Sequence, residues 1–239
     1  MLNIKMRNMI GEYENAISDE VVDALKDYMD SKENFQLQGQ IGANGTIDRA
    51  IKDSLDFNIL GEFGGDEDYI HKTILPMLSE QLDQSLIKYL KDYPTSQDMI
   101  DVLDKDDEEI LEEFYKTYSH WPLSIVMKKY NKGKQGYHGF HEDKGNTEPT
   151  VYRDFVLMFY LADVDKGGET EFYHQGVKVK PKKGKVVIFP SGWTHLHKGH
   201  IPESNDKYIC NFWILKGSME LKPTIAGKWN TPSDLPENQ

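Results

Sequence analysis

The spacing of apolar residues along the chain changes near residue 120, and this change constrains the fold more than any other feature of the sequence. From residue 121 onward, apolar and β-branched runs are short and are separated by turn residues, a pattern typical of β-strands. Because these runs follow one another closely, we predict a double-sheet barrel or jelly roll. The predicted strands are 123–130, 136–143, 154–164, 169–173, 177–180, 185–190 and 207–215.

The first half of the chain has the spacing of helices instead. Ser18 precedes apolar residues at helical intervals, so we predict a helix with a serine N-cap that runs to about Asp30. In the next predicted helix, Pro76 should either produce a kink or mark the true start. The remaining predictions are helices over about 66–89 and 97–118, and short strands and loops over 34–62.

These elements together predict the α+β class. We expect a double-stranded β-helix (jelly-roll) core in the C-terminal half, braced by the N-terminal helices. The 239 residues fit one domain. Within 1–239 we expect a mainly helical support region at 1–120, the jelly-roll core at 121–216 and a loosely ordered tail at 217–239, which is rich in Pro, Asn and Thr.

Composition excludes several classes of function. The net charge of −12 disfavours a nucleic-acid partner, since such proteins usually carry a basic face. We interpret the basic run at 177–185 as a solvated strand and turn. No stretch approaches the roughly 20 apolar residues of a membrane span, and the N-terminus lacks the apolar core of a signal peptide. We therefore expect a cytoplasmic protein without a membrane partner. The single cysteine, Cys210, excludes an internal disulfide and a thiolate metal cluster.

One pattern among the eight histidines points to chemistry. Only His141 begins a His-x-Asp triplet, which ends at Asp143. In an extended strand, residues i and i+2 face the same side, so both side chains could bind one metal ion. Further histidines at 195, 197 and 200 follow the apolar run 185–190. Two imidazoles and one carboxylate are the ligands of non-haem iron(II) oxygenases, with coordination positions left open.

Residues 121–215 resemble the prolyl 4-hydroxylase group of iron(II)- and 2-oxoglutarate-dependent dioxygenases. In that group a lysine stands ten residues after the second histidine ligand. Lys207 stands ten residues after His197, so the resemblance favours His197 as the third ligand and leaves His195 as the alternative. The motifs that carry the resemblance are HED (141–143), RDFVLMFYLADVDKGGETEF (153–172), PKKG (181–184), VVIFP (186–190), HKG (197–199) and Lys207.

The resemblance implies a role for each matching residue. Iron(II) would be held by the three ligands His141, Asp143 and His197, and Lys207 would pair with the far carboxylate of 2-oxoglutarate. Tyr130 matches a tyrosine that binds 2-oxoglutarate. However, the chain has about two extra residues between Tyr130 and the triplet, so Tyr137 remains an alternative.

Two further positions match residues at the substrate side of the family's site. Arg153 matches an arginine that contacts substrate peptides, and Trp213 matches an aromatic residue at the active-site floor. Each also has a purely structural interpretation, as a strand-end charge and as a core residue. The loops 40–62 and 144–152 are candidates for lids.

The implied function is that of an oxidoreductase that hydroxylates an unactivated C–H bond. A prolyl residue of a peptide or protein is the favoured substrate; dioxygen is consumed, and succinate and CO2 are released. Ascorbate is a further candidate cofactor, whose need the sequence does not decide. Alternatives are the same chemistry on a free amino acid, another small metabolite or a modified nucleobase, and a non-catalytic metal-binding jelly roll. Lys207 and the acidic balance disfavour the nucleobase.

Overall fold

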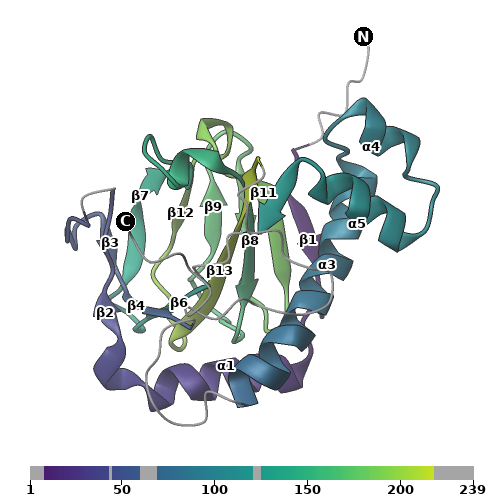
Figure 1. Cartoon of the computed structure of the whole chain (residues 1–239). Coiled ribbons are helices and arrows are strands. Elements are labelled where there is room, and N and C mark those ends of the chain that lie inside the picture. Colours follow the sequence, from purple (N-terminus) through teal and green to yellow (C-terminus); the bar gives the residue numbers. More distant parts are fainter. Residues whose placement is uncertain (1–7, 43–44, 60–68, 121–124, 218–239) are drawn as a thin grey trace, which may run out of the picture.

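The computed structural model describes residues 8–42, 45–59, 69–120 and 125–217. Two β-sheets face each other, and helices cover the outer face of the larger one (Figure 1). The helical segments are α1 (Asp19–Ser31), η1 (Glu33–Phe35), η2 (Ile70–Ile74), α3 (Leu75–Asp92), α4 (Gln97–Asp101), α5 (Asp107–Tyr115), η3 (Thr150–Tyr152) and η4 (Trp193–His195). The strands are β1 (Gly11–Tyr13), β2 (Leu37–Gln38), β3 (Lys52–Asp53), β4 (Leu55–Asn58), β5 (Tyr118–His120), β6 (Val126–Tyr130), β7 (Gly136–His141), β8 (Arg153–Tyr160), β9 (Thr170–Phe172), β10 (Val177–Val179), β11 (Val186–Pro190), β12 (His197–Gly199) and β13 (Lys207–Lys216).

The strand order is that of a jelly roll built from antiparallel pairs. The larger sheet has the order β1-β11-β8-β13-β6-β4-β2, with β5 paired to β13 off this path. The smaller sheet has the order β10-β9-β12-β7-β3. Most neighbours in each sheet are not consecutive in the sequence, so the chain crosses between the two sheets. The prediction of an α+β fold with a double-stranded β-helix core is confirmed.

Alternation along the central strands produces two separate cores. One side of β8 packs against α1 and α3, and the other side faces the space between the sheets. Strand β8 is therefore apolar at nearly every position, as expected for a strand that is buried on both faces. The outward residues are Phe155, Leu157 and Phe159, and the inward residues are Val156, Met158 and Tyr160.

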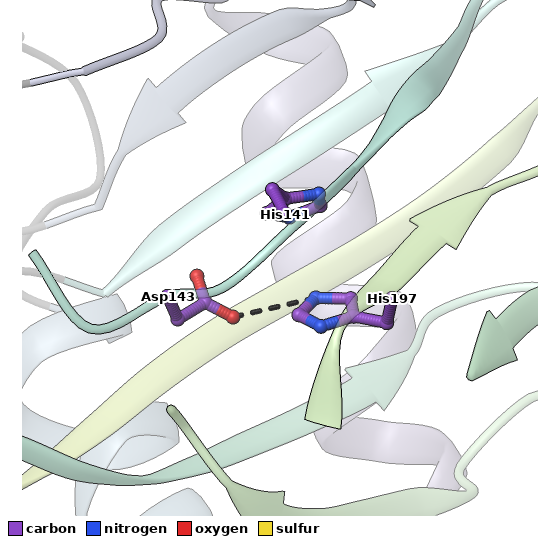
Figure 2. Close-up of side chains that lie close together, drawn as sticks. All are labelled: His141, Asp143 and His197. Atoms are coloured by element: carbon purple, nitrogen blue, oxygen red, sulfur yellow. Dashed lines mark ion pairs between the residues drawn. The ribbon is translucent and has the colours of Figure 1, made fainter. Parts of the chain in front are cut away.

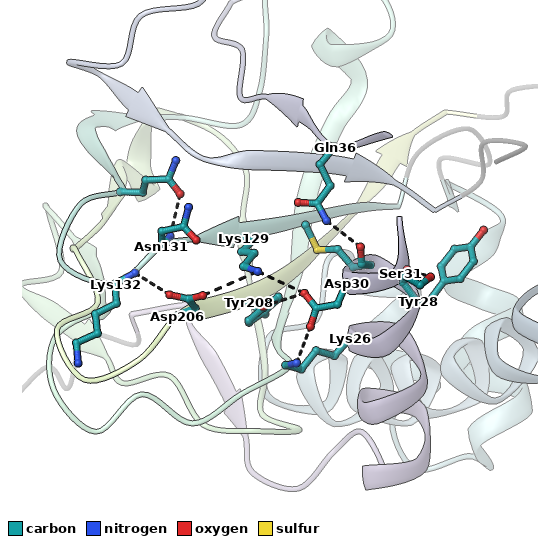
Figure 3. Close-up of polar contacts among 12 residues, drawn as sticks. Lys26, Tyr28, Asp30, Ser31, Gln36, Lys129, Asn131, Lys132, Asp206 and Tyr208 are labelled. Carbon is teal, nitrogen blue, oxygen red and sulfur yellow. Dashed lines mark hydrogen bonds and ion pairs between the residues drawn. The ribbon is translucent and has the colours of Figure 1, made fainter. Parts of the chain in front are cut away.

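Helix α1 is fixed to the larger sheet by a polar cluster around Asp30 (Figure 3). The Tyr208 hydroxyl of β13 donates to Asp30 at 2.9 Å, and the Lys129 ammonium of β6 lies 3.4 Å from the same carboxylate. Lys26 adds an ion pair at 2.7 Å one helical turn away. Lys129 therefore points outward, toward the helix, because it alternates with inward-facing neighbours on β6.

The first two predicted helices are present, and the third is not continuous. Helix α1 begins directly after Ser18, whose hydroxyl accepts a hydrogen bond from Gln81 instead of capping the helix. Pro76 lies in the first turn of α3, directly after the π-helical turn η2, so the helical backbone continues through the proline. The single helix predicted over 97–118 is wrong. The acidic run breaks it into α4 and α5, because Asp106 caps a new helix start by accepting from the Glu109 N–H at 3.0 Å.

Replacing Asp106 by alanine should lower the free energy of unfolding by about 1 kcal/mol, since the first turn of α5 loses its capping acceptor. Chemical denaturation of the variant measures this loss. Asp104→Ala, in the exposed turn before the cap, is the matched control and should have little effect. Equal destabilisation by both changes would contradict the capping role.

The remaining predictions concern the C-terminal strands, the tail, the cysteine and a membrane span. The seven predicted C-terminal strands are present with shifted ends, but the three-residue strand β12 was missed. The tail at 218–239, residues 60–68 and residues 121–124 lie outside the described residues. Cys210 is buried, as expected. Within the described ranges, no helix combines the length and apolarity that crossing a membrane requires.

Candidate metal centre and its pocket

Antiparallel pairing of β7 with β12 brings three predicted ligands together. His197 lies directly across from His141 in the register, and the two imidazole centres are 4.3 Å apart. Asp143 follows the end of β7, in a bend whose N–H donates to the Ser191 carbonyl at 2.9 Å. The three side chains converge on one point (Figure 2), and one ligand atom from each lies within 4.8 Å of the others.

Backbone carbonyls fix both rings with the same nitrogen facing the centre. Nδ1 of His141 lies 3.1 Å from the Gly139 carbonyl, and Nδ1 of His197 lies 3.0 Å from the His195 carbonyl. A ring nitrogen beside a carbonyl must donate, so the proton resides on Nδ1 and the lone pair on Nε2. Metal-binding histidines are oriented in this way in proteins generally.

The carboxylate of Asp143 carries an orphaned atom. Its Oδ2 is buried without a hydrogen-bond partner among the described residues, and it lies 3.4 Å from Nε2 of His197. Burying such an oxygen is costly unless a ligand satisfies it. A metal cation would satisfy this oxygen and both Nε2 lone pairs together. The donor set, two imidazoles and one hard carboxylate, fits iron(II).

The protonation states are those that a cation requires. Burial, reinforced by the neighbouring His197, lowers the pKa of His141 to about 3. Burial also lowers the pKa of His197. For Asp143, burial works in the opposite direction, but the two histidines, Lys128 and Arg153 outweigh it and lower the carboxyl pKa. Near neutral pH the site therefore holds two neutral imidazoles and one carboxylate.

A buried ammonium lies deeper between the sheets. Lys207, the first residue of β13, is 2% exposed, and its Nζ lies 5.6 Å from the ring centres of Tyr130 and Tyr160. Burial lowers the pKa of this lysine to about 7, with a smaller opposing effect from Glu169. Among the described residues Lys207 makes no ion pair. The space between the sheets therefore holds one desolvated cation that has no ion-pair partner in the described part of the chain.

The two candidate tyrosines occupy different places. Tyr130 pairs with Lys207 across β6 and β13, and it is 3% exposed. Tyr137 instead stacks on the His141 ring, with centres 3.5 Å apart and planes at 8°. Only Tyr130 therefore lies beside the deep lysine.

Arg153 and Trp213 line a pocket of about 530 Å³ together with His141 and Asp143. The Arg153 guanidinium stacks 3.9 Å from the centre of the Trp213 ring. It also donates to the Asp143 carbonyl at 3.0 Å, so it steadies the ligand loop. The pocket rim includes Gln40, Ile41 and Gly42 from one predicted lid, and Lys144, Gly145, Asn146 and Thr150 from the other.

The other histidines near the third ligand have partners elsewhere. His195 is buried and contacts the Asn8 carbonyl at 3.0 Å through Nε2 and the Thr194 hydroxyl through Nδ1. His200 pairs with Glu171 at 2.6 Å. Neither belongs to the convergent group, although the His195 carbonyl orients His197.

Sequence reasoning missed a second inward lysine, Lys128. It lines the pocket and is 7% exposed. Strand alternation could have found it, because Lys128 stands two residues before Tyr130 and must share its face. Asp56, from β4 across the sheet, also lines the pocket and was missed for lack of any motif.

Comparison with known proteins agrees with this geometry. Residues 125–215 match the family described as the 2OG-Fe(II) oxygenase superfamily. The chain is also 30% identical over 107 residues to prolyl 4-hydroxylase subunit alpha-1 of Gallus gallus. That alignment covers 38% of this chain and 21% of the relative, so the chain spans about a fifth of that protein.

Solved structures share the fold at low sequence identity. The viral collagen prolyl hydroxylase of Paramecium bursaria Chlorella virus-1, in a 2OG complex, has a TM-score of 0.55 at 18% identity and covers 88% of this chain and 97% of its own. A Trichoplax adhaerens prolyl hydroxylase, solved with a hypoxia inducible factor peptide, has a TM-score of 0.61 at 17% identity and covers 87% and 84%. A Pseudomonas putida prolyl-4-hydroxylase has a TM-score of 0.55 at 16% identity and covers 86% and 92%. The resemblance to prolyl 4-hydroxylase-like 2OG-Fe(II) oxygenases is confirmed.

Proposed function

We propose that this chain is an iron(II)- and 2-oxoglutarate-dependent dioxygenase whose favoured substrate is a prolyl residue of a peptide or protein. One observation carries the proposal: two Nε2 lone pairs and the orphaned Asp143 oxygen converge beside a pocket. The reaction combines a C–H bond, dioxygen and 2-oxoglutarate, and it yields a hydroxyl group, succinate and CO2. We further propose that 1–239 acts as a single domain in the cytoplasm.

The metal ligands, Lys207 and the apolar walls of the site each have a separate role in the proposed reaction. His141, Asp143 and His197 hold the metal, and the backbone carbonyls behind the two rings keep both lone pairs directed at it. Iron(II), when bound, would supply the activation of dioxygen needed to break a C–H bond. Lys207 binds the far carboxylate of 2-oxoglutarate, with the Tyr130 phenol beside it. The apolar walls of the inner core keep water out, which strengthens this charge pair.

Arg153 and Trp213 form the substrate side of the site. Their stacked side chains line the pocket, where a pyrrolidine ring of the substrate would pack against them. Substrate contact by these two residues is part of the proposal. Ascorbate enters only as a reductant that could restore iron(II), and its omission from the assay tests that need.

Succinate release tests the function directly. The purified full chain, loaded with iron(II) and 2-oxoglutarate, should release succinate faster when a proline-rich peptide is present. The peptide should gain 16 Da, and a matched peptide with alanine for proline should gain nothing. Stimulation by free L-proline or another small acid in place of the peptide would favour the small-metabolite alternative. Absence of succinate under every condition would favour a non-catalytic jelly roll.

Binding of 2-oxoglutarate should be linked to a proton on Lys207. In the unliganded protein the pKa of Lys207 is lowered to about 7 by burial, so the amine is mostly neutral above that pH. A carboxylate favours the ammonium form, so binding at pH 8.5 should take up about one proton. Affinity should fall as the pH rises above about 7 and should level off below it. Anaerobic calorimetry in buffers of different ionisation enthalpy measures the uptake.

The control for this titration is Lys129→Met, which removes an ammonium from the outer face of β6. It should leave the uptake unchanged, whereas Lys207→Met should remove it. Equal uptake in the wild type and Lys207→Met would contradict the role of Lys207.

A further inference from the structure

Two buried lysines lie on the inner face of the larger sheet, Lys128 on β6 and Lys207 on the neighbouring strand β13. Tyr130 pairs with Lys207 across the sheet, and Lys128 pairs with Ile209, two residues further along β13. Lys128 lines the pocket beside Asp143 and Arg153, whereas Lys207 does not reach the pocket wall. Lys128 therefore borders the pocket that His141 and Asp143 also line, and Lys207 lies outside that lining.

Lys128 lacks a carboxylate of its own within the described part of the chain. Its Nζ lies 3.0 Å from the Asn211 amide oxygen, in the orientation that satisfies that amide, and 5.8 Å from the Trp213 ring centre. The nearest acidic neighbour on β4, Asp56, already accepts from Lys52 and from the Ser54 hydroxyl at 2.7 Å. An amide oxygen and an aromatic face are neutral partners, so Lys128 makes no ion pair among the described residues, although Asp56 and Asp143 nearby favour its charged form.

Most of the charged groups that line the pocket have partners or lie in contact with water. Lys52 is paired with Asp56, and Lys144 is paired with Asp154 at 2.7 Å. Asp143 is directed at the metal site. Glu142 lies exposed at the rim, in contact with bulk water. The Arg153 guanidinium donates to the Asp143 carbonyl, so Lys128 is the lining cation for which the described residues supply no ion pair.

A buried ammonium is costly. Burial lowers the pKa of Lys128 to about 8, and Lys52 nearby adds to the effect. An apolar side chain of similar length would fill the same space without that cost. Buried charges that lack counter-ions and border a pocket are typical of ligand-binding positions. A carboxylate arriving with the substrate would complete the pair in a largely dry environment.

We propose that Lys128 binds a carboxylate group of the substrate, so that this protein hydroxylates an acid-bearing compound rather than a neutral stretch of polypeptide. The inference rests on the proposed function, whose substrate class it narrows. The carboxylate has two sources: the α-carboxylate of a free amino acid or C-terminal residue, or the side chain of an acidic residue beside the proline. Arg153, stacked on Trp213, borders the same group.

Calorimetric binding to the metal-free full chain tests the subsite without any turnover. The first pair of probes is N-acetyl-L-proline and N-acetyl-L-prolinamide, which differ only in the α-carboxylate. The second pair is acetyl-Gly-Pro-Asp-amide and acetyl-Gly-Pro-Asn-amide, which differ only in a side-chain carboxylate. The wild type should bind the acid of one pair at least about 30-fold more tightly than its neutral partner. The pair that shows the preference identifies the source.

Variants at Lys128 test whether the preference for the acid probe over the neutral probe comes from the ammonium of this residue. Lys128→Met should remove the preference and leave the affinity for the neutral probe and for 2-oxoglutarate unchanged. Lys128→Arg should restore part of it, because the charge returns. Lys129→Met is the matched control: it removes the same charge from the next residue of β6, on the outer face beside Asp30 (Figure 3), and should keep the full preference.

Several results would overturn the proposal. These are equal binding of acid and neutral probes by the wild type, no binding of any probe, a preference that survives in Lys128→Met, or loss of 2-oxoglutarate affinity in that variant. A failure of the proposed function looks different. In that case prolyl compounds never stimulate succinate release, while the carboxylate preference and its dependence on Lys128 persist.

Discussion

Replacing His141 by alanine should lower 2-oxoglutarate turnover by at least about 100-fold, because the metal loses one of its three protein ligands. Removing even an outer partner of a metal ligand typically costs 10- to 100-fold in affinity. The loss should appear in iron binding as well, so anaerobic equilibrium dialysis with iron(II) is measured beside succinate release. The remaining pair, Asp143 and His197, offers only two donors at 3.4 Å.

The matched control is His200→Ala, which removes an imidazole that pairs with Glu171 outside the convergent group. It should keep nearly full activity and iron binding. Thermal unfolding of both metal-free variants checks that the chain still folds. A His141→Ala protein that binds iron like the wild type would defeat the assignment of the metal centre.

Replacing Lys207 by methionine should raise the KM for 2-oxoglutarate by about 100-fold, because the far carboxylate would enter a dry cavity without a cation. Breaking a buried charge pair from one side costs about 2–5 kcal/mol, and each 1.4 kcal/mol corresponds to tenfold. Steady-state kinetics at saturating iron(II) measures the change. The KM for the substrate that undergoes hydroxylation should change far less than the KM for 2-oxoglutarate.

The same variant should be at least as stable as the wild type when no ligand is present. The ammonium is 2% exposed and has no ion pair among the described residues, so its removal relieves desolvation. Chemical denaturation of the metal-free proteins measures this. Lys129→Met serves as the control and should leave the KM for 2-oxoglutarate near the wild-type value. An unchanged KM in Lys207→Met would show that another group binds the carboxylate.

Much of the fold could be predicted because its signals are local. Short β-branched runs between turn residues indicated the C-terminal strands, and helical spacing after Ser18 indicated α1. The signals failed where a competing local preference decided the outcome. The acidic run near Asp106 offered a capping acceptor, so the chain starts a new helix there instead of continuing the previous one. Strand β12 reads His-Lys-Gly and contains no apolar or β-branched residue, so it carries none of the pattern by which the other short strands were recognised.

The site was predictable to the same extent. Strand period predicted that His141 and Asp143 share a face, although β7 ends at His141 and Asp143 lies in the bend that follows, and the family resemblance related His197 to Lys207 by their spacing of ten. The side-chain period could also have found Lys128. The partners of these groups come from distant segments, and no periodicity relates them: the carbonyl behind each imidazole, the Ser191 carbonyl that holds the Asp143 bend, and the Lys52 and Ser54 groups that engage Asp56.

The sequence by itself determined which residues could supply ligand atoms and which of them would share a face of an extended strand, because alternation along a strand is a property of the extended backbone. Only the tertiary structure decided that β12 lies antiparallel to β7, which brings two imidazoles from distant segments to 4.3 Å. It also decided which cations are left without counter-ions. Strand pairing and burial depend on the packing of the whole chain. Whether a buried charge has a counter-ion depends in turn on which groups the strand pairing and burial bring together.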